Sequence, residues 1–203
     1  MAPGQYFDRA PDAPSRPRTI TLSLPDLDVE LVTDRAVFAG ARIDPGTKYL
    51  LIEAPPPSAG ATDLLDLGCG YGPIAVTLAR RAPEATVWAV DVNERALELC
   101  RANAERAGVS NVHVCDPDDV PADVRFDGIW SNPPIRIGKA ALHELLLRWL
   151  DRLADEARAH LVVQKHLGAD SLAGWLADEG WVVTRLGSRQ GYRLLDVGRA
   201  PTT

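Results

Sequence analysis

The sequence predicts an α/β protein with a doubly wound, mostly parallel, seven-stranded Rossmann-like sheet. Three observations support this prediction. From residue 62 onward, short apolar runs alternate with segments of helical periodicity, which is typical of strands joined by crossover helices. Several of these runs end in an acidic or amide side chain, at the edge where such sheets bind ligands. A glycine-rich turn from Gly68 to Gly72 follows the first run.

The chain ahead of this alternation has a different character. Residues 1–18 are rich in Pro, Ala and Asp, so we expect a flexible tail, in which the aromatic pair Tyr6 and Phe7 is the exception. Residues 19–58 predict a small β-rich extension, with a hairpin of two alternating segments followed by a short helix that ends before three prolines. Residues 59–203 form the predicted main domain.

Within the main domain, the strands and helices follow one another in regular order. Asn93 is a suitable N-cap for the second helix, and Gly108 a suitable stop. The last two strands flank Gly191 closely enough to pair as a hairpin, which predicts an antiparallel strand at the sheet edge. Strands are predicted at 63–66, 86–91, 111–115, 126–131, 160–164, 181–186 and 192–197, and helices at 73–81, 93–108, 140–153 and 171–178.

Composition excludes several classes of protein. The 203 residues carry a formal net charge of −6, which argues against indiscriminate binding to polyanions. The three cysteines lack the spacing of metal ligands, so we expect no metal. No apolar run approaches the length of a membrane span and the N-terminus has no signal core, so a cytoplasmic protein without membrane contact is expected.

The glycine-rich turn suits a ligand that approaches the main chain. Gly68, Gly70 and Gly72 allow backbone shapes that other residues adopt only at a cost, and the following helix directs free N–H groups at the turn. Such glycines also occur in purely structural turns. Two acids favour a nucleoside site: Asp66 enters the turn, and Asp91 ends the next strand about twenty residues on, where an acid can bind ribose hydroxyls.

A second motif, Asn132-Pro133-Pro134-Ile135, follows the fourth strand of the main domain. Consecutive prolines fix the backbone and remove two N–H donors. The carbonyls of Asn132 and Pro133, with the Asn132 side-chain oxygen, then form acceptors suited to a planar amine that donates two hydrogen bonds. Holding the amine in this way directs its lone pair toward an electrophile, which is catalysis by positioning. A rigid turn without chemistry is the alternative interpretation.

These motifs together resemble those of class I S-adenosylmethionine-dependent methyltransferases. The Asn-Pro-Pro motif is similar to that of enzymes acting on amino groups. The segment from Asn132 to Lys139, the late segment from Ser188 to Arg193 and the pair Gly46-Thr47 resemble the small-domain family of ribosomal RNA guanine-N2 methyltransferases. Many relatives carry Phe or Tyr where this chain has Ile135, which gives apolar contact without stacking. Two-domain members also have a second methyltransferase-like half that this chain lacks.

The resemblance implies a role for each matching residue. The cofactor would be S-adenosyl-L-methionine, with the glycines along its methionine part and Asp66 near its ammonium. Asn132 and Pro133 would hold the acceptor amine as the catalytic pair. The cofactor residues implied are Thr47, Asp66, Gly68, Gly70, Gly72, Asp91, Val92 and Asp116, with Asp91 at the ribose and Asp116 at the adenine amine.

The substrate implied is an RNA guanine, in ribosomal or transfer RNA, presented unpaired or flipped out. An acidic protein needs local positive charge to hold RNA, and basic residues after strand ends could meet its phosphates. Residues assigned to substrate binding are Pro134, Ile135, Arg136, Lys139, Lys165, His166 and Arg193, and Arg189 could join them.

Two other functions remain open at this stage. The same chemistry could act on a protein glutamine amide or a small-molecule amine. A nucleotide-binding module without catalysis, or a dinucleotide oxidoreductase, is the other alternative. Against an oxidoreductase, the glycines alternate one by one, whereas the dinucleotide motif places its third glycine further on.

Overall fold

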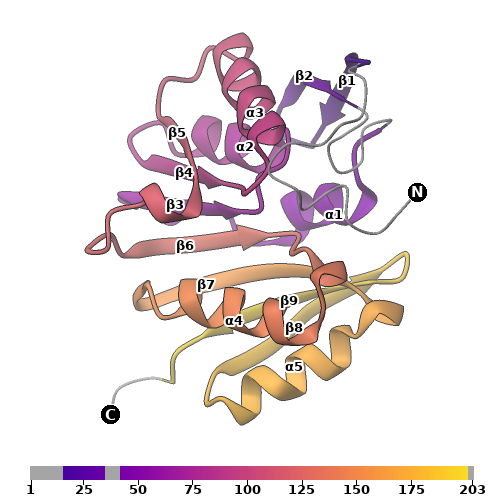
Figure 1. The fold of residues 1–203 in the computed structure, drawn as a ribbon, viewed down its shortest axis with the longest axis vertical. Coiled ribbons are helices and arrows are strands. Elements are labelled where there is room, and N and C mark those ends of the chain that lie inside the picture. Colours follow the sequence, from indigo (N-terminus) through magenta and orange to yellow (C-terminus); the bar gives the residue numbers. More distant parts are fainter. Residues whose placement is uncertain (1–15, 35–41, 201–203) are drawn as a thin grey trace.

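The computed structural model describes residues 16–34 and 42–200. Most of the predicted tail, with Tyr6 and Phe7, and part of the predicted extension lie outside these residues. Seven strands form one sheet in the order β5-β4-β3-β6-β7-β9-β8, and a separate antiparallel pair, β1-β2, precedes it (Figure 1). The prediction of a doubly wound, mostly parallel sheet with an N-terminal hairpin is confirmed.

The elements follow the predicted order closely. Pro73 begins α2 at a position where its missing N–H costs nothing, and the Asn93 side chain accepts a hydrogen bond from the N–H of Ala96 at the start of α3. The strands are β1 (Arg18–Ser23), β2 (Asp28–Thr33), β3 (Asp63–Leu67), β4 (Thr86–Val90), β5 (Val112–Cys115), β6 (Phe126–Ser131), β7 (Leu153–Gln164), β8 (Val182–Arg189) and β9 (Tyr192–Gly198). The helices are α1 (Pro45–Glu53), α2 (Pro73–Arg81), α3 (Glu94–Arg106), α4 (Lys139–Leu150) and α5 (Ala169–Asp178), with short 3₁₀ turns η1 (Pro117–Asp119), η2 (Ile135–Ile137) and η3 (Lys165–Leu167).

Two apolar cores lie on opposite faces of the sheet. One joins the sheet to α1, α2, α3 and the β1-β2 hairpin, and the other joins it to α4 and α5 (Figure 1). Strands buried on both faces read as continuous apolar runs, which is why the central strands could be identified from sequence. The two cores hold the loops at the carboxyl ends of β3, β4 and β6 in fixed positions.

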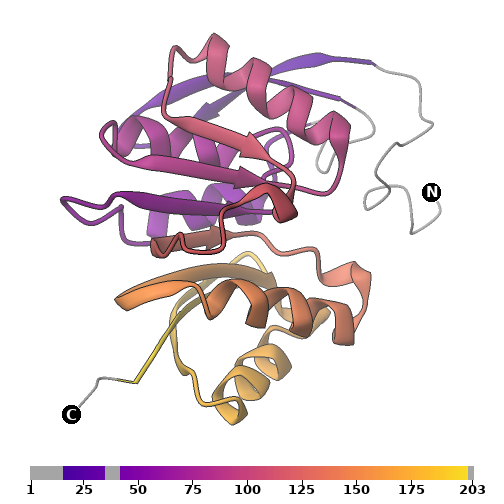
Figure 2. The same ribbon diagram turned by 60° about the vertical axis from the view of Figure 1, so that its left-hand side comes forward.

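The β1-β2 hairpin lies beside α3 and shares the first core, as two views show (Figures 1 and 2). The buried side chain of Asn103 in α3 accepts a hydrogen bond from the N–H of Val32 at 2.7 Å. Its amide nitrogen donates to the carbonyls of Val32 and Tyr71, at 2.7 and 2.8 Å. Arg81 of α2 forms an ion pair with Asp26 at 2.8 Å. The hairpin is therefore tied to the helix pair that carries the glycine-rich turn.

The predicted end of the helix at 140–153 and the predicted start of the strand at 160–164 were both too late in the chain. Helix α4 ends at Leu150, and β7 begins at Leu153, which pairs with Phe126. The first part of β7 is irregular: Glu156 has a φ of 64°, and the pairing with β6 shifts between Phe126 and Gly128. Its polar residues gave no strand signal because several of them face solvent.

The predicted antiparallel C-terminal hairpin is confirmed, and the structure shows which of its two strands joins the rest of the sheet. The antiparallel strand is β9, and it lies between β7 and β8, so that β8 forms the edge. In this position β9 gains partners on both sides, and its side chains Leu194, Leu195 and Val197 are buried. A sequence pattern shows that two strands form a hairpin, but not which of them pairs with the rest of the sheet.

Candidate functional site

The glycine-rich turn connects β3 to α2 and is held by backbone hydrogen bonds. Gly68, Gly70 and Gly72 have φ values of 77°, 54° and 88°, in the region that favours glycine. The N–H groups of Gly68 and Cys69 both donate to the carbonyl of Val90, at 2.9 Å. This contact fixes the turn against the end of β4, beside Asp91.

The three glycines differ in what surrounds them. A Cβ on Gly68 would meet only Cδ of Pro134, at 4.0 Å, so the Asn-Pro-Pro segment lies directly across from this glycine. A Cβ on Gly72 would lie 2.7 Å from Sγ of Cys100 in α3. Gly68 therefore leaves room beside the turn, whereas Gly72 is needed for the close packing of α3.

Asp66 is fully buried at the base of the turn. One carboxylate oxygen accepts a hydrogen bond from the N–H of Ala75 at 2.8 Å, and the other has no partner among the described residues. The pKa of Asp66 is raised to about 8, mainly by burial; the hydrogen bond from the N–H of Ala75 lowers it and the nearby Asp91 carboxylate adds to the rise. An unpaired buried carboxyl group at this point favours a cationic ligand.

Asp91 follows β4 and faces the same turn. Its carboxylate accepts hydrogen bonds from the N–H of Gly70 at 2.9 Å and from the N–H of Asn93 at 3.0 Å. Burial raises its pKa, although these hydrogen bonds act in the opposite direction. Asp91 is only partly buried. Its carboxylate has further lone pairs, which can accept hydrogen bonds from the hydroxyl groups of a ligand. Val92, beside it, is 42% exposed.

The remaining predicted cofactor residues lie in two places. Asp116 follows β5, next along the same edge of the sheet, where its side chain accepts a hydrogen bond from the N–H of Asp118 at 3.0 Å. Thr47, by contrast, lies in the first turn of α1, buried against Asn132. The structure thus brings Asp66, Asp91 and the glycines together and places Thr47 with the Asn-Pro-Pro segment.

Asn132 directly follows β6, the strand that pairs with β3. Its side-chain nitrogen forms hydrogen bonds within the protein. That nitrogen donates to Oδ1 of Asp44 at 2.8 Å and to Oγ1 of Thr47 at 3.0 Å. No donor within residues 16–34 and 42–200 reaches the Asn132 side-chain oxygen. The carbonyl of Pro133 accepts one hydrogen bond, from the N–H of Ile135 at 2.8 Å, and keeps a second lone pair.

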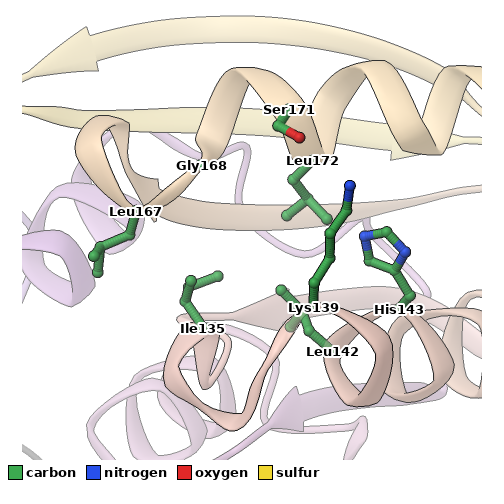
Figure 3. A pocket seen from close by; sticks show the side chains of 8 residues that line it. All are labelled: Ile135, Lys139, Leu142, His143, Leu167, Gly168, Ser171 and Leu172. Carbon is green, nitrogen blue, oxygen red and sulfur yellow. The ribbon is translucent and has the colours of Figure 1, made fainter.

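Beyond Pro134, two of the predicted substrate residues, Ile135 and Lys139, line a cavity of about 150 Å³ between α4 and α5. Ile135, Leu142, Leu167 and Leu172 form most of its wall, and Lys139 extends from α4 toward α5 across it (Figure 3).

The predicted basic residues fall into two groups. Arg136, Lys139, Lys165 and His166 are exposed, and none of them forms an ion pair with another described residue. Arg193 instead pairs with Asp170 at 3.0 Å and donates to Oγ of Ser188, and Arg189 lies 3.8 Å from Glu53. Among the predicted basic residues, those without an ion pair in the described part of the chain therefore lie in η2, η3 and the start of α4.

Two polar residues that make long-range contacts in and near the site, Asp44 and Asn103, were not identified from the sequence. Nothing in the sequence singles out Asp44, which stands before a short predicted helix, and Asn103 has no distinguishing feature among the polar residues of its helix. Asp44 contacts Asn132, which lies 88 positions further along the chain. Asn103 contacts Val32, which lies 71 positions before it. A single sequence carries no signal of such contacts.

A sheet in this order, with a glycine-rich turn after one central strand and Asn-Pro-Pro after its neighbour, defines a methyltransferase of the Rossmann-like class. Comparison with known proteins agrees: residues 28–196 match the family described as "Methyltransferase small domain". The chain belongs to this family and is an S-adenosylmethionine-dependent enzyme.

Three individual proteins illustrate the similarity. The chain is 33% identical to the uncharacterised protein YbxB of Bacillus subtilis, over 94% of this chain and 96% of that protein. It is 30% identical to ribosomal RNA small subunit methyltransferase C of Shewanella pealeana, over 72% of this chain and only 43% of that enzyme. The T. thermophilus 16S rRNA N2 G1207 methyltransferase, solved with AdoMet and guanosine, superposes with a TM-score of 0.73 at 22% identity, over 94% of this chain and 52% of that one.

Proposed function

We propose that this protein transfers a methyl group from S-adenosyl-L-methionine to the exocyclic 2-amino group of a guanine in ribosomal RNA. One observation carries the proposal above the others: the Asn132 amide nitrogen is occupied by Asp44 and Thr47, which leaves the amide oxygen available at the end of β6. The similarity to two ribosomal RNA methyltransferases supports ribosomal RNA as the substrate, and the one solved with guanosine supports guanine as the acceptor; the chain spans about half the length of each.

The residues around the glycine-rich turn fit the proposed cofactor. The unpaired oxygen of buried Asp66 suits a nearby ammonium group, and the open space beside Gly68 suits a chain that crosses the turn. Asp91, held by two backbone N–H groups, would accept hydrogen bonds from ribose hydroxyls. Val92 would give apolar contact to the adenine and Asp116 would accept from its amine. S-adenosyl-L-methionine, when bound, supplies a methyl group on a positively charged sulfur.

The acceptor amine would be held by the Asn-Pro-Pro segment, which faces Gly68 across the open space beside the turn. The side-chain oxygen of Asn132 and the second lone pair of the Pro133 carbonyl would each accept one N–H of the amine. The nitrogen lone pair then points at the methyl carbon, and the proton leaves for solvent after the new carbon–nitrogen bond has formed. No strong base is needed, so the contribution of these residues is orientation, which can account for several powers of ten in rate.

The RNA would be held by the exposed cations beyond the two prolines. We propose that Pro134 and Ile135 contact the base, and that Arg136, Lys139, Lys165 and His166 meet phosphates. Arg193 would support this surface through its ion pair with Asp170. Within the described residues, no helix is long and apolar enough to cross a membrane. We propose the bacterial cytoplasm, where ribosomal RNA is found, as the location.

Methyl transfer with purified components tests this proposal. We expect the protein to transfer labelled methyl groups from S-adenosyl-L-methionine to small-subunit ribosomal RNA, either free or in particles. Digestion of the product should yield N2-methylguanosine. Transfer to a protein glutamine or to a free amine, with none to RNA, would show that the acceptor has been assigned to the wrong class of molecule.

A further inference from the structure

We infer that Asp44 is a positioning residue, which holds the side-chain amide of Asn132 so that its oxygen faces the acceptor amine. The inference rests on the proposed function for the identity of the acceptor, but the orientation of the amide can be measured without a substrate. Asp44 lies 88 positions before Asn132, in the N-terminal part of the chain, and is 9% exposed.

The hydrogen bonds of the Asn132 side-chain amide are compatible with only one orientation of its oxygen and nitrogen. An asparagine amide offers two N–H donors on its nitrogen and two lone pairs on its oxygen. Both acceptors next to the Asn132 nitrogen belong to the protein: Oδ1 of Asp44 at 2.8 Å and Oγ1 of Thr47 at 3.0 Å. An ionised carboxylate accepts but cannot donate, so turning the amide by half a rotation would place two oxygens against each other.

Asp44 is itself held by α1 and β9, and β7 supports the contact with β9. As the N-cap of α1, its Oδ1 accepts a hydrogen bond from the N–H of Thr47 at 2.9 Å. Its Oδ2 faces the hydroxyl of Tyr192 in β9 at 3.4 Å, and Gln164 at the end of β7 donates to that hydroxyl at 2.8 Å. A carboxylate with both oxygens engaged in this way has little freedom to turn.

The packing of α1 against β9 keeps this cluster together. Gly46, next to the cap, lies so close to the Tyr192 ring that a Cβ at this position would come within 2.4 Å of a ring carbon. No larger residue fits there without displacing Tyr192. The C-terminal hairpin thus determines where Asp44 sits, and Asp44 determines how Asn132 is turned.

Loss of the Asp44 carboxylate should lower the rate of methyl transfer rather than the affinity for the cofactor. Without the carboxylate, the Asn132 amide could turn either way, and the wrong orientation would present N–H groups to an amine that also donates. A misdirected acceptor loses alignment with the methyl group, and small misplacements can cost on the order of a hundredfold in rate. Within residues 16–34 and 42–200, Asp44 forms no hydrogen bond or ion pair with Asp91 or with the three glycines of the turn, so cofactor affinity should not change.

The first test measures the amide directly. In ¹⁵N-labelled protein without substrate, the Asn132 side-chain signal can be identified by its absence in Asn132→Ala. We expect both amide protons to be protected from exchange with solvent, and Asp44→Ser to reduce this protection by at least about tenfold. Serine keeps the helix cap, so α1 should stay folded. Equal protection in the two proteins would overturn the inference.

The second test separates positioning from general support. For methyl transfer, Asp44→Ser should lower kcat on the order of a hundredfold and leave the Kd for S-adenosyl-L-methionine within about twofold. In an Asn132→Ala background, the same change should cause no further loss, because both act through one amide. Asp44→Asn keeps an oxygen that can face Asn132 and should recover part of the rate.

The matched control is Asp26→Ser, which makes the same replacement in the same N-terminal part of the chain. Its carboxylate pairs with Arg81 rather than with Asn132, so its kcat and amide protection should match the wild type. Additive losses in the double mutant, or a cofactor Kd that rises as much as kcat falls, would overturn the positioning role. If the wild type makes no N2-methylguanosine but Asp44→Ser still releases the amide, the proposed substrate fails while the role of Asp44 stands.

Discussion

Replacement of Asp66 by Asn should change how the stability of the ligand-free protein depends on pH. The buried carboxyl group has a pKa of about 8 in the folded protein, against an ordinary value of 3.8. Between these two values the folded state binds a proton that the unfolded state has lost. The free energy of unfolding therefore falls as pH rises, by about 1.4 kcal/mol per pH unit, or about 3 kcal/mol from pH 5 to pH 7.

Urea denaturation at several pH values measures this effect. Asp66→Asn keeps the shape and the acceptor for the N–H of Ala75 but removes the proton equilibrium, so its free energy of unfolding should depend less steeply on pH than that of the wild type. Taking the difference between the two proteins cancels the titrating groups that do not interact with Asp66. Asp63→Asn, at the opposite end of β3, removes a carboxylate that bonds to Trp88 and serves as the control. Equal pH slopes in wild type and Asp66→Asn would refute the reasoning.

Three further predictions concern binding and turnover. Asp91→Ala should weaken S-adenosyl-L-methionine binding by about tenfold or more in calorimetry, because charge-assisted hydrogen bonds to ribose are lost; unchanged affinity would remove the ribose assignment. Asn132→Ala should keep cofactor affinity and lose on the order of a hundredfold or more in kcat, and near-normal turnover would contradict the positioning mechanism. Charge reversal at Lys139 and Lys165 together should weaken RNA binding and flatten its salt dependence while cofactor binding is unchanged; wild-type methylation of RNA at every salt concentration would exclude these lysines from the RNA surface.

The central part of the fold could be predicted because its residues carry strong local signals. Strands β3, β4 and β6 each contain a short apolar run, and the turns after them contain glycines, prolines or acids whose backbone preferences are narrow. These same turns carry the residues of the candidate site. The geometry that brings Gly68 and Pro134 together follows from the parallel pairing of β3 and β6.

What could not be predicted depends on contacts distant in sequence. The start of β7 is polar and irregular, and only its pairing with Phe126 makes it a strand. The place of β9 inside the sheet depends on its pairing with β7, which has no local signature. The hydrogen bond from the Asn132 side chain to the Thr47 hydroxyl joins positions far apart in the chain, so no local pattern indicates it, and the cofactor role of Thr47 stays a prediction. The division of the chain into a tail, an extension and a main domain stays a prediction.

The most direct measurement of the proposed function is mass spectrometry of nucleosides from the small-subunit ribosomal RNA of cells that lack the gene. We expect a loss of N2-methylguanosine, restored by the wild-type protein and not by Asn132→Ala produced at the same level. Asn132→Ala separates catalysis from mere presence of the protein, since its cofactor site is left intact. An unchanged level of N2-methylguanosine in the ribosomal RNA of the deletion strain would contradict guanine methylation as the function of this protein.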